Sequence, residues 1–100
     1  MNKYVIERSI PGVGSLDRNG LHAISTKSAC VMDVLGPDIQ WVYSFVTDDK
    51  IYCVYLAENE QLIRDHARRA GFPVDRVSAV RAMIDPTMRS ASTASTAAAA

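Results

Sequence analysis

The chain has 100 residues, of which 48% are hydrophobic, and its eleven basic residues are balanced by eleven acidic residues. No basic cluster exceeds the pair Arg68-Arg69, which argues against a surface for nucleic acid or anionic membrane. No apolar run approaches the length of a bilayer span, and the first residues, MNKYVIERSI, lack the long apolar centre of a secretory signal. We therefore expect a cytoplasmic protein that binds neither nucleic acid nor membrane.

The composition predicts one domain over residues 1–87 and a tail over residues 88–100. From Met88 the chain reads MRSASTASTAAAA, which cannot bury enough apolar surface to offset its chain entropy. We expect this tail to be disordered and of low complexity. A domain of the remaining size has a small core, and association with a partner often supplies further stability.

The chain contains two cysteines, Cys30 and Cys53, in segments that are predicted to be regular. They have no CxxC spacing. In a reducing compartment we expect both to be buried thiols rather than a disulfide or a metal pair.

The first strand is predicted over residues 3–10, and Pro11-Gly12 ends it with a turn. Two faces alternate along it, with Tyr4, Ile6 and Arg8 on one and Val5 and Glu7 on the other.

A helix is predicted next, with Ser15 as its N-cap. Gly20 weakens its first turns, so we expect the firm part to begin after that residue. Gly36-Pro37 ends the helix, because glycine accepts the left-handed conformation and proline cannot continue the helix. The positions that recur at helical spacing are Leu21, Ile24, Ser28, Val31 and Leu35.

The segment from Trp41 to Leu56 is predicted to be a β-hairpin with Asp48 and Asp49 in its loop. Regular alternation gives it two faces. One carries Trp41, Tyr43, Phe45, Tyr52, Val54 and Leu56, and the other carries Val42, Ser44, Val46, Ile51, Cys53 and Tyr55. Both faces are largely apolar, so the sheet needs two covers, and the sequence leaves open which face lies under the helices.

A second helix is predicted over residues 60–70, with Asn59 as its N-cap and Gly71 after its end. His66 lies on the apolar side of this helix. The last strand is predicted over residues 77–84, and Asp85-Pro86 closes the domain.

This order of elements predicts an α+β protein of the ferredoxin-like class, βαββαβ, in which two helices cover one face of a four-stranded antiparallel sheet. The other face then lacks a cover within the chain. We expect a second copy to supply it, giving a homodimer that forms a dimeric α+β barrel.

Two runs of the sequence resemble a bacterial family of small nickel-binding or nickel-responsive proteins that form ferredoxin-like dimers. They are KYVIERSIPG and GPDIQWVYSFVTDDKIYCVYLAENEQLIRDHARRAGFPVDRVSAVRAMIDPT, and the resemblance covers most of residues 3–87. The resemblance implies nickel as the bound metal. It favours Glu7, Tyr43, Tyr52 and His66 as metal ligands, with Cys53 and Tyr55 as further site candidates. Relatives often carry histidine where this chain has Tyr43, and tyrosine is a poorer nickel ligand than imidazole, so metal binding is expected to be weakened or lost.

The residues by themselves indicate a metal only weakly. His22 and His66 lie on different predicted helices and form no HxxxH or HExxH pair. The alternative for His66 is a buried histidine bonded to a local acceptor. Glu7 is alternatively a charge at the sheet rim, and the tyrosines are alternatively packing residues.

The sequence contains no nucleophile elbow, glycine-rich phosphate loop or paired-carboxylate motif. No catalytic residue and no residue for an organic cofactor is therefore predicted. The leading hypothesis is a homodimer that binds nickel or responds to it. One alternative is a dimer that binds or oxidises a small organic molecule between its two sheets, with His66 or Glu7 for proton transfer. Its pocket would be lined by Trp41, Tyr43, Phe45 and Tyr52. The other is a non-catalytic dimerisation module.

Overall fold

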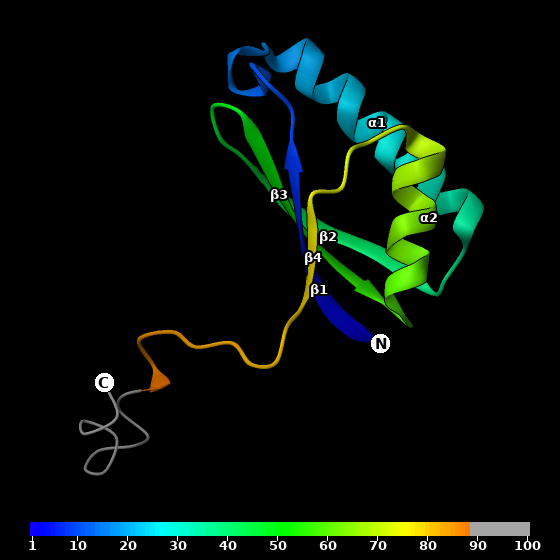
Figure 1. The fold of residues 1–100 in the computed structure, drawn as a ribbon, viewed down its shortest axis with the longest axis vertical. Helices are drawn as coiled ribbons and strands as arrows, with labels where there is room; N and C mark the ends of the chain where they lie inside the picture. The colour runs from blue at the N-terminus through cyan, green and yellow to red at the C-terminus, as the bar shows by residue number, and fades with distance from the viewer. Residues whose placement is uncertain (89–100) are drawn as a thin grey trace.

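Two helices lie across one face of a four-stranded sheet, and the described residues place no layer on the other face (Figure 1). The computed structural model describes residues 1–88. The elements in chain order are β1 (Asn2–Ser9), the 3-10 turn η1 (Val13–Ser15), α1 (Arg18–Leu35), β2 (Ile39–Val46), β3 (Lys50–Ala57), α2 (Glu60–Ala70) and β4 (Arg76–Ala79).

The strands lie in the order β2-β3-β1-β4, and every neighbouring pair is antiparallel. This is the strand order of the ferredoxin-like fold, so the predicted α+β class and the predicted βαββαβ order are confirmed.

The face of the sheet that lies under the helices, called here the inner face, carries the core. Ile6 of β1 and Ile63 of α2 are fully buried between the two layers. The inner face also includes Tyr4, Ile39, Ile51, Cys53, Tyr55 and Ala57. The opposite face, called the open face, carries Val5, Glu7, Tyr43, Phe45, Tyr52, Val54 and Leu56. The orientation that the sequence left open is therefore set, with Cys53 and Tyr55 toward the helices.

A β-bulge in β2 changes the face on which Trp41 lies. Trp41 pairs with Tyr55 and Tyr43 pairs with Val54, which makes Val42 the extra residue. One extra residue moves every earlier side chain of the strand to the opposite face. The predicted grouping of Trp41 with Tyr43 was therefore wrong, and Trp41 lies on the inner face, where its indole N–H donates to Ser44 Oγ at 2.9 Å.

The turn between β2 and β3 fixes the segment that leads into α1. Its loop contains Asp48 and Asp49, as predicted. The N–H of Gly12 donates to Asp49 Oδ1 and the N–H of Gly14 donates to Asp48 O, both at 2.9 Å. A side chain at Gly14 would come within 2.6 Å of the Thr47 carbonyl oxygen, so this close approach requires glycine.

Side-chain and glycine caps mark the helix ends. Asn59 accepts a hydrogen bond from the Leu62 N–H at 3.1 Å, and Gly71 follows α2 with a φ of 73°, as predicted. Gly36 also ends α1, as predicted, but its φ of 82° and ψ of −161° lie outside the left-handed helical conformation. The predicted N-cap of α1 was wrong, because Ser15 belongs to η1 and Asp17 caps the helix by accepting from the Gly20 N–H at 2.8 Å. The side chain of Asp17 holds this first turn, so α1 begins at Arg18, before Gly20.

The last strand is shorter than predicted. β4 ends at Ala79, which lies opposite Tyr4, and the Val80 N–H still donates to the Lys3 carbonyl at 2.9 Å. The antiparallel register would place the next residues beside the start of β1 at Asn2, so the sheet offers no further partner. Met83 and Ile84 accordingly lie outside the sheet, 63% and 83% exposed.

Cys53 is buried, as predicted, whereas Cys30 is exposed on α1, and neither is in a disulfide. The prediction for Cys30 was wrong because its position on α1 faces away from the sheet. Apart from Met88, the predicted tail over residues 88–100 lies outside the described residues. Within residues 1–88 no helix is both long and apolar enough to cross a membrane.

Candidate functional site

The structure places the four predicted metal ligands on two sides of the sheet. Glu7 and Tyr52 lie opposite each other on the open face, in the β1–β3 ladder. Tyr43 lies on the same face, on the edge strand β2. His66 lies on α2, beneath the inner face, and is fully buried. One ion within a single chain could therefore not contact all four residues.

Two basic residues flank Glu7 on the open face. The Lys50 ammonium lies 3.9 Å from the Glu7 carboxylate, and Arg76 of β4 lies opposite Glu7 in the β1–β4 ladder. Both charges oppose the approach of a metal cation to Glu7. This carboxylate is thus partly neutralised within the chain.

Aromatic side chains form the exposed part of the open face on β2. Tyr43 is 47% exposed and Phe45 is 61% exposed, and their ring centroids are 5.3 Å apart. Phe45 also lies opposite Tyr52 in the β2–β3 ladder. These rings form an apolar patch that no described residue covers.

Both ring nitrogens of His66 lie within hydrogen-bond distance of protein groups. Nε2 lies 3.3 Å from the Ser28 carbonyl oxygen, and Nδ1 lies 3.3 Å from the Tyr55 hydroxyl. The carbonyl can only accept, so Nε2 carries the proton of the neutral ring and Nδ1 accepts from Tyr55. Burial lowers the pKa of His66, the Ser28 backbone hydrogen bond opposes this shift, and the Arg8 charge adds to it. His66 is therefore a neutral histidine held by local partners.

These donors do not make a nickel site within one chain. Across residues 1–88 no group of three or more His, Cys, Asp or Glu side chains is placed to hold a metal ion. Among the described residues, the open face offers one carboxylate and two phenols as oxygen donors, whereas Ni(II) prefers imidazole nitrogen. A nickel site on this face would need donors from outside the single chain.

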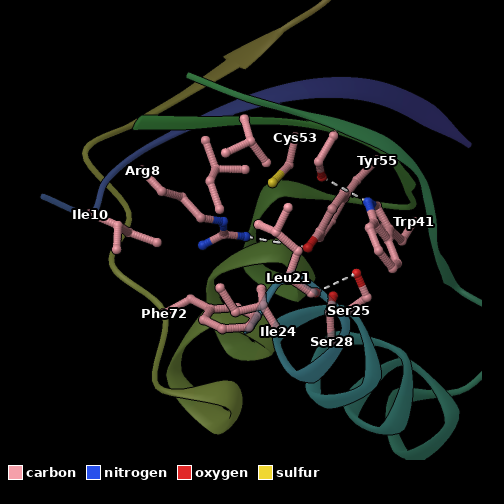
Figure 2. Close-up of a pocket in the computed structure, with 13 residues that line it drawn as sticks. Arg8, Ile10, Leu21, Ile24, Ser25, Ser28, Trp41, Cys53, Tyr55 and Phe72 are labelled. Carbon is pink, nitrogen blue, oxygen red and sulfur yellow. Dashed lines mark hydrogen bonds between the residues drawn. The ribbon is translucent and has the colours of Figure 1, made fainter. Parts of the chain in front are cut away.

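A cavity of about 250 Å³ lies on the other side of the sheet, between the inner face and α1 (Figure 2). It is not the inter-sheet pocket expected from the sequence. Its apolar walls are formed by Ile10, Leu21, Ile24, Trp41, Val46, Ile51 and Phe72, and the polar groups along it belong to Arg8, Ser25, Ser28, Ser44 and Tyr55.

Arg8 is the charged group of this cavity and is only 2% exposed. Its Nη1 donates to the Pro73 carbonyl at 2.8 Å and its Nη2 donates to the Tyr55 hydroxyl at 3.4 Å. Nε is buried and has no hydrogen-bond partner in the described part of the chain. Burial raises the pKa of Tyr55, and the Arg8 charge partly offsets that rise.

Sequence reasoning placed Arg8 in the alternation of the first strand but gave it no role. The available signal was a charged residue following Tyr4 and Ile6 on the face that proves to be inward. Tyr55 and Phe72 lie in the run that carries the family resemblance, and Ser28 was predicted only at helical spacing. The fold brings these three residues to the same cavity.

Comparison with known proteins identifies one family and one solved structure. The model of the family described as nickel responsive protein SCO4226-like matches residues 4–80. The crystal structure of SCO4226 from Streptomyces coelicolor A3(2) is similar, with a TM-score of 0.69, 15% sequence identity, and coverage of 82% of this chain and 99% of that chain. At this identity the structural similarity concerns the fold alone. No curated protein shows a significant match.

Proposed function

Because this chain belongs to the SCO4226-like family of nickel responsive proteins, we propose that it binds nickel as a homodimer, through donors on the open face of its sheet. The observation that carries the proposal is the position of Glu7, Tyr43 and Tyr52 together on the one face that the described residues leave without a cover.

The exposed apolar surface supports pairing with a second copy. Tyr43 and Phe45 are exposed on the open face, and Val42 of the bulge beside them is 45% exposed. The same face carries Glu7 together with Lys50 and Arg76, so two copies related by a two-fold axis present both signs of charge to each other. A second sheet packed there would bury the aromatic patch as the helices bury the inner face.

Pairing also doubles the number of oxygen donors available to nickel. Among the described residues one chain offers one open-face carboxylate, Glu7, and a dimer offers two. Burial in the interface would strengthen both the attraction of the cation to the two Glu7 carboxylates and its repulsion from Lys50 and Arg76, because water no longer screens either. The proposal therefore requires Lys50 and Arg76 to point away from the ion. His66 has no part in this proposal, since the sheet separates it from the open face and its two nitrogens are already engaged.

Calorimetric titration of the metal-free protein with Ni(II) tests this assignment. We expect nickel uptake by the parent protein, loss of uptake in Glu7→Gln, and unchanged uptake in His66→Ala. Glu58→Gln is the matched control, because Glu58 is an exposed carboxylate just beyond the end of β3. Absence of nickel uptake, or uptake that depends on His66 rather than Glu7, would contradict the proposal.

The same titration of Tyr43→His tests the position on β2. Imidazole is a better nickel ligand than phenol, so this substitution should raise the affinity at least about tenfold. Tyr55→His is unsuitable as a comparison because it would disturb the core, whereas Tyr43 is exposed. Equal affinities of the parent and Tyr43→His would place the metal away from this residue.

A further inference from the structure

Arg8 combines deep burial with an uncompensated charge. Its side chain is 2% exposed, and no carboxylate of the described residues forms an ion pair with it. A buried cation normally has an anionic partner, because removal from water is costly. The guanidinium makes two hydrogen bonds, both to neutral oxygens, and its Nε has no hydrogen-bond partner among the described residues. No negatively charged group of the described residues therefore neutralises it.

The surrounding contacts hold the guanidinium in one place. Its Cζ lies 5.4 Å from the ring centroid of Phe72 and 5.9 Å from that of Tyr55. The bond to the Pro73 carbonyl ties it to the segment between α2 and β4. Figure 2 shows the guanidinium end of Arg8 extending from β1 into the space between the sheet and the helices. The positive charge is therefore positioned before any ligand arrives.

We propose that this cavity binds a small monocarboxylate with an apolar body, whose carboxylate meets the Arg8 guanidinium. The planar guanidinium presents its N–H groups in a fork that matches a carboxylate, and Nη1 and Nη2 each keep one N–H beyond their bonds to Pro73 and Tyr55. The inference is independent of the nickel proposal, because the cavity and the open face lie on opposite sides of the sheet.

The walls and the size of the cavity define the rest of the ligand. Ile24, Val46 and Phe72 suit an aliphatic or aromatic body rather than a polar one. A volume of about 250 Å³ is below the roughly 300–1,000 Å³ of pockets for drug-sized molecules, so the ligand is smaller than these. Trp41 and the 41% exposed Val46 of edge strand β2 line the cavity, which places its entrance beside that strand.

One positive charge favours a carboxylate over a phosphate. The remaining polar groups on the cavity wall are neutral hydroxyls, and Ser28 and Tyr55 already contact His66. His66 is held neutral, since both burial and the Arg8 charge lower its pKa. A doubly charged anion would therefore keep one charge without a partner.

Trp41 is the single tryptophan of the chain and lines the cavity, so its fluorescence reports binding directly. The probes are benzoate and hexanoate, compared with benzamide and with inorganic phosphate. We expect a saturable fluorescence change with the two carboxylates and at least a tenfold weaker response to benzamide and to phosphate. No response to either carboxylate at millimolar concentration, or an equal response to benzamide or phosphate, would overturn the proposal.

Two variants and one control assign the response to the cavity. Arg8→Met should weaken carboxylate binding at least tenfold, whereas the control Arg69→Met, at an exposed arginine on α2, should leave it unchanged. Ser25→Leu keeps Arg8 but fills space beside α1, and it should abolish binding even if Arg8→Met fails to fold. Carboxylate binding that persists in Ser25→Leu would place the ligand outside the cavity and overturn the assignment.

Discussion

At the scale of single residues, one buried charge determines the chemistry beneath the sheet. Arg8 donates to the Tyr55 hydroxyl, Tyr55 donates to His66 Nδ1, and His66 Nε2 donates to the Ser28 carbonyl. Each group fixes the proton position of the next. These hydrogen bonds explain why His66, the histidine that the family resemblance favours as a metal ligand, is unsuited to that role.

The buried state of His66 predicts a pH dependence of stability. Its pKa in the folded chain lies below the ordinary value of 6.5, so the unfolded chain takes up the proton first as the pH falls. The contribution to the free energy of unfolding is complete above about pH 6.5 and decreases below it, by at most about 1.4 kcal/mol per pH unit.

Urea unfolding between pH 7.5 and 5.5 measures this effect. We expect His66→Gln to lose the decrease in stability, because glutamine does not titrate, and His22→Gln to retain it, because His22 is exposed. An identical pH slope in His66→Gln and the parent protein would show that His66 is not the titrating group.

The inward position of His66 could be predicted from its helical spacing, and its bonds could not. Those bonds depend on Ser28 of α1 and Tyr55 of β3, which are far from it along the chain. Arg8 shows the same limit, because alternation placed it on the side of Tyr4 and Ile6 but could not show that this side lies under the helices.

At the scale of elements, the ends of α2 show how local signals determine a helix. Asn59 accepts from the Leu62 N–H, and Gly71 adopts the left-handed conformation that ends the helix. Both caps could be predicted from the sequence because they depend on residue type alone. The bulge in β2 could not be predicted, since Val42 lies between Trp41 and Tyr43 without a glycine or proline to mark the extra residue.

Substitution of the cap measures what Asn59 contributes. Asn59→Ala should lower the free energy of unfolding by about 1 kcal/mol, because the Leu62 N–H loses its acceptor. Asn59→Asp keeps an acceptor oxygen and should remain within a few tenths of a kcal/mol of the parent. Urea midpoints at an unchanged m-value report both effects, and equal losses in the two variants would exclude a capping role.

The last strand shows how an element depends on its neighbour. Residues 77–84 have the composition of a strand, but β1 begins at Asn2 and pairs with β4 only from Tyr4 to Glu7. Sequence pattern therefore predicted the existence of β4 and the register limited its length.

At the scale of the whole molecule, the sheet is covered on one side and open on the other (Figure 1). The topology could be predicted because each element had a distinct pattern. The separation of the predicted ligands could not, since alternation gave β1 two faces but could not show that the face without Glu7 lies under α2, which carries His66.

Native mass spectrometry of the protein with added Ni(II) tests the central claim most directly, because it reports assembly and metal together. We expect a dimer that carries nickel. Phe45→Lys, which places a charge in the aromatic patch, should give a monomer without nickel, and Val34→Lys, at a 70% exposed position on α1, should behave as the parent. A parent protein that is monomeric, or a Phe45→Lys monomer that retains nickel, would contradict the account.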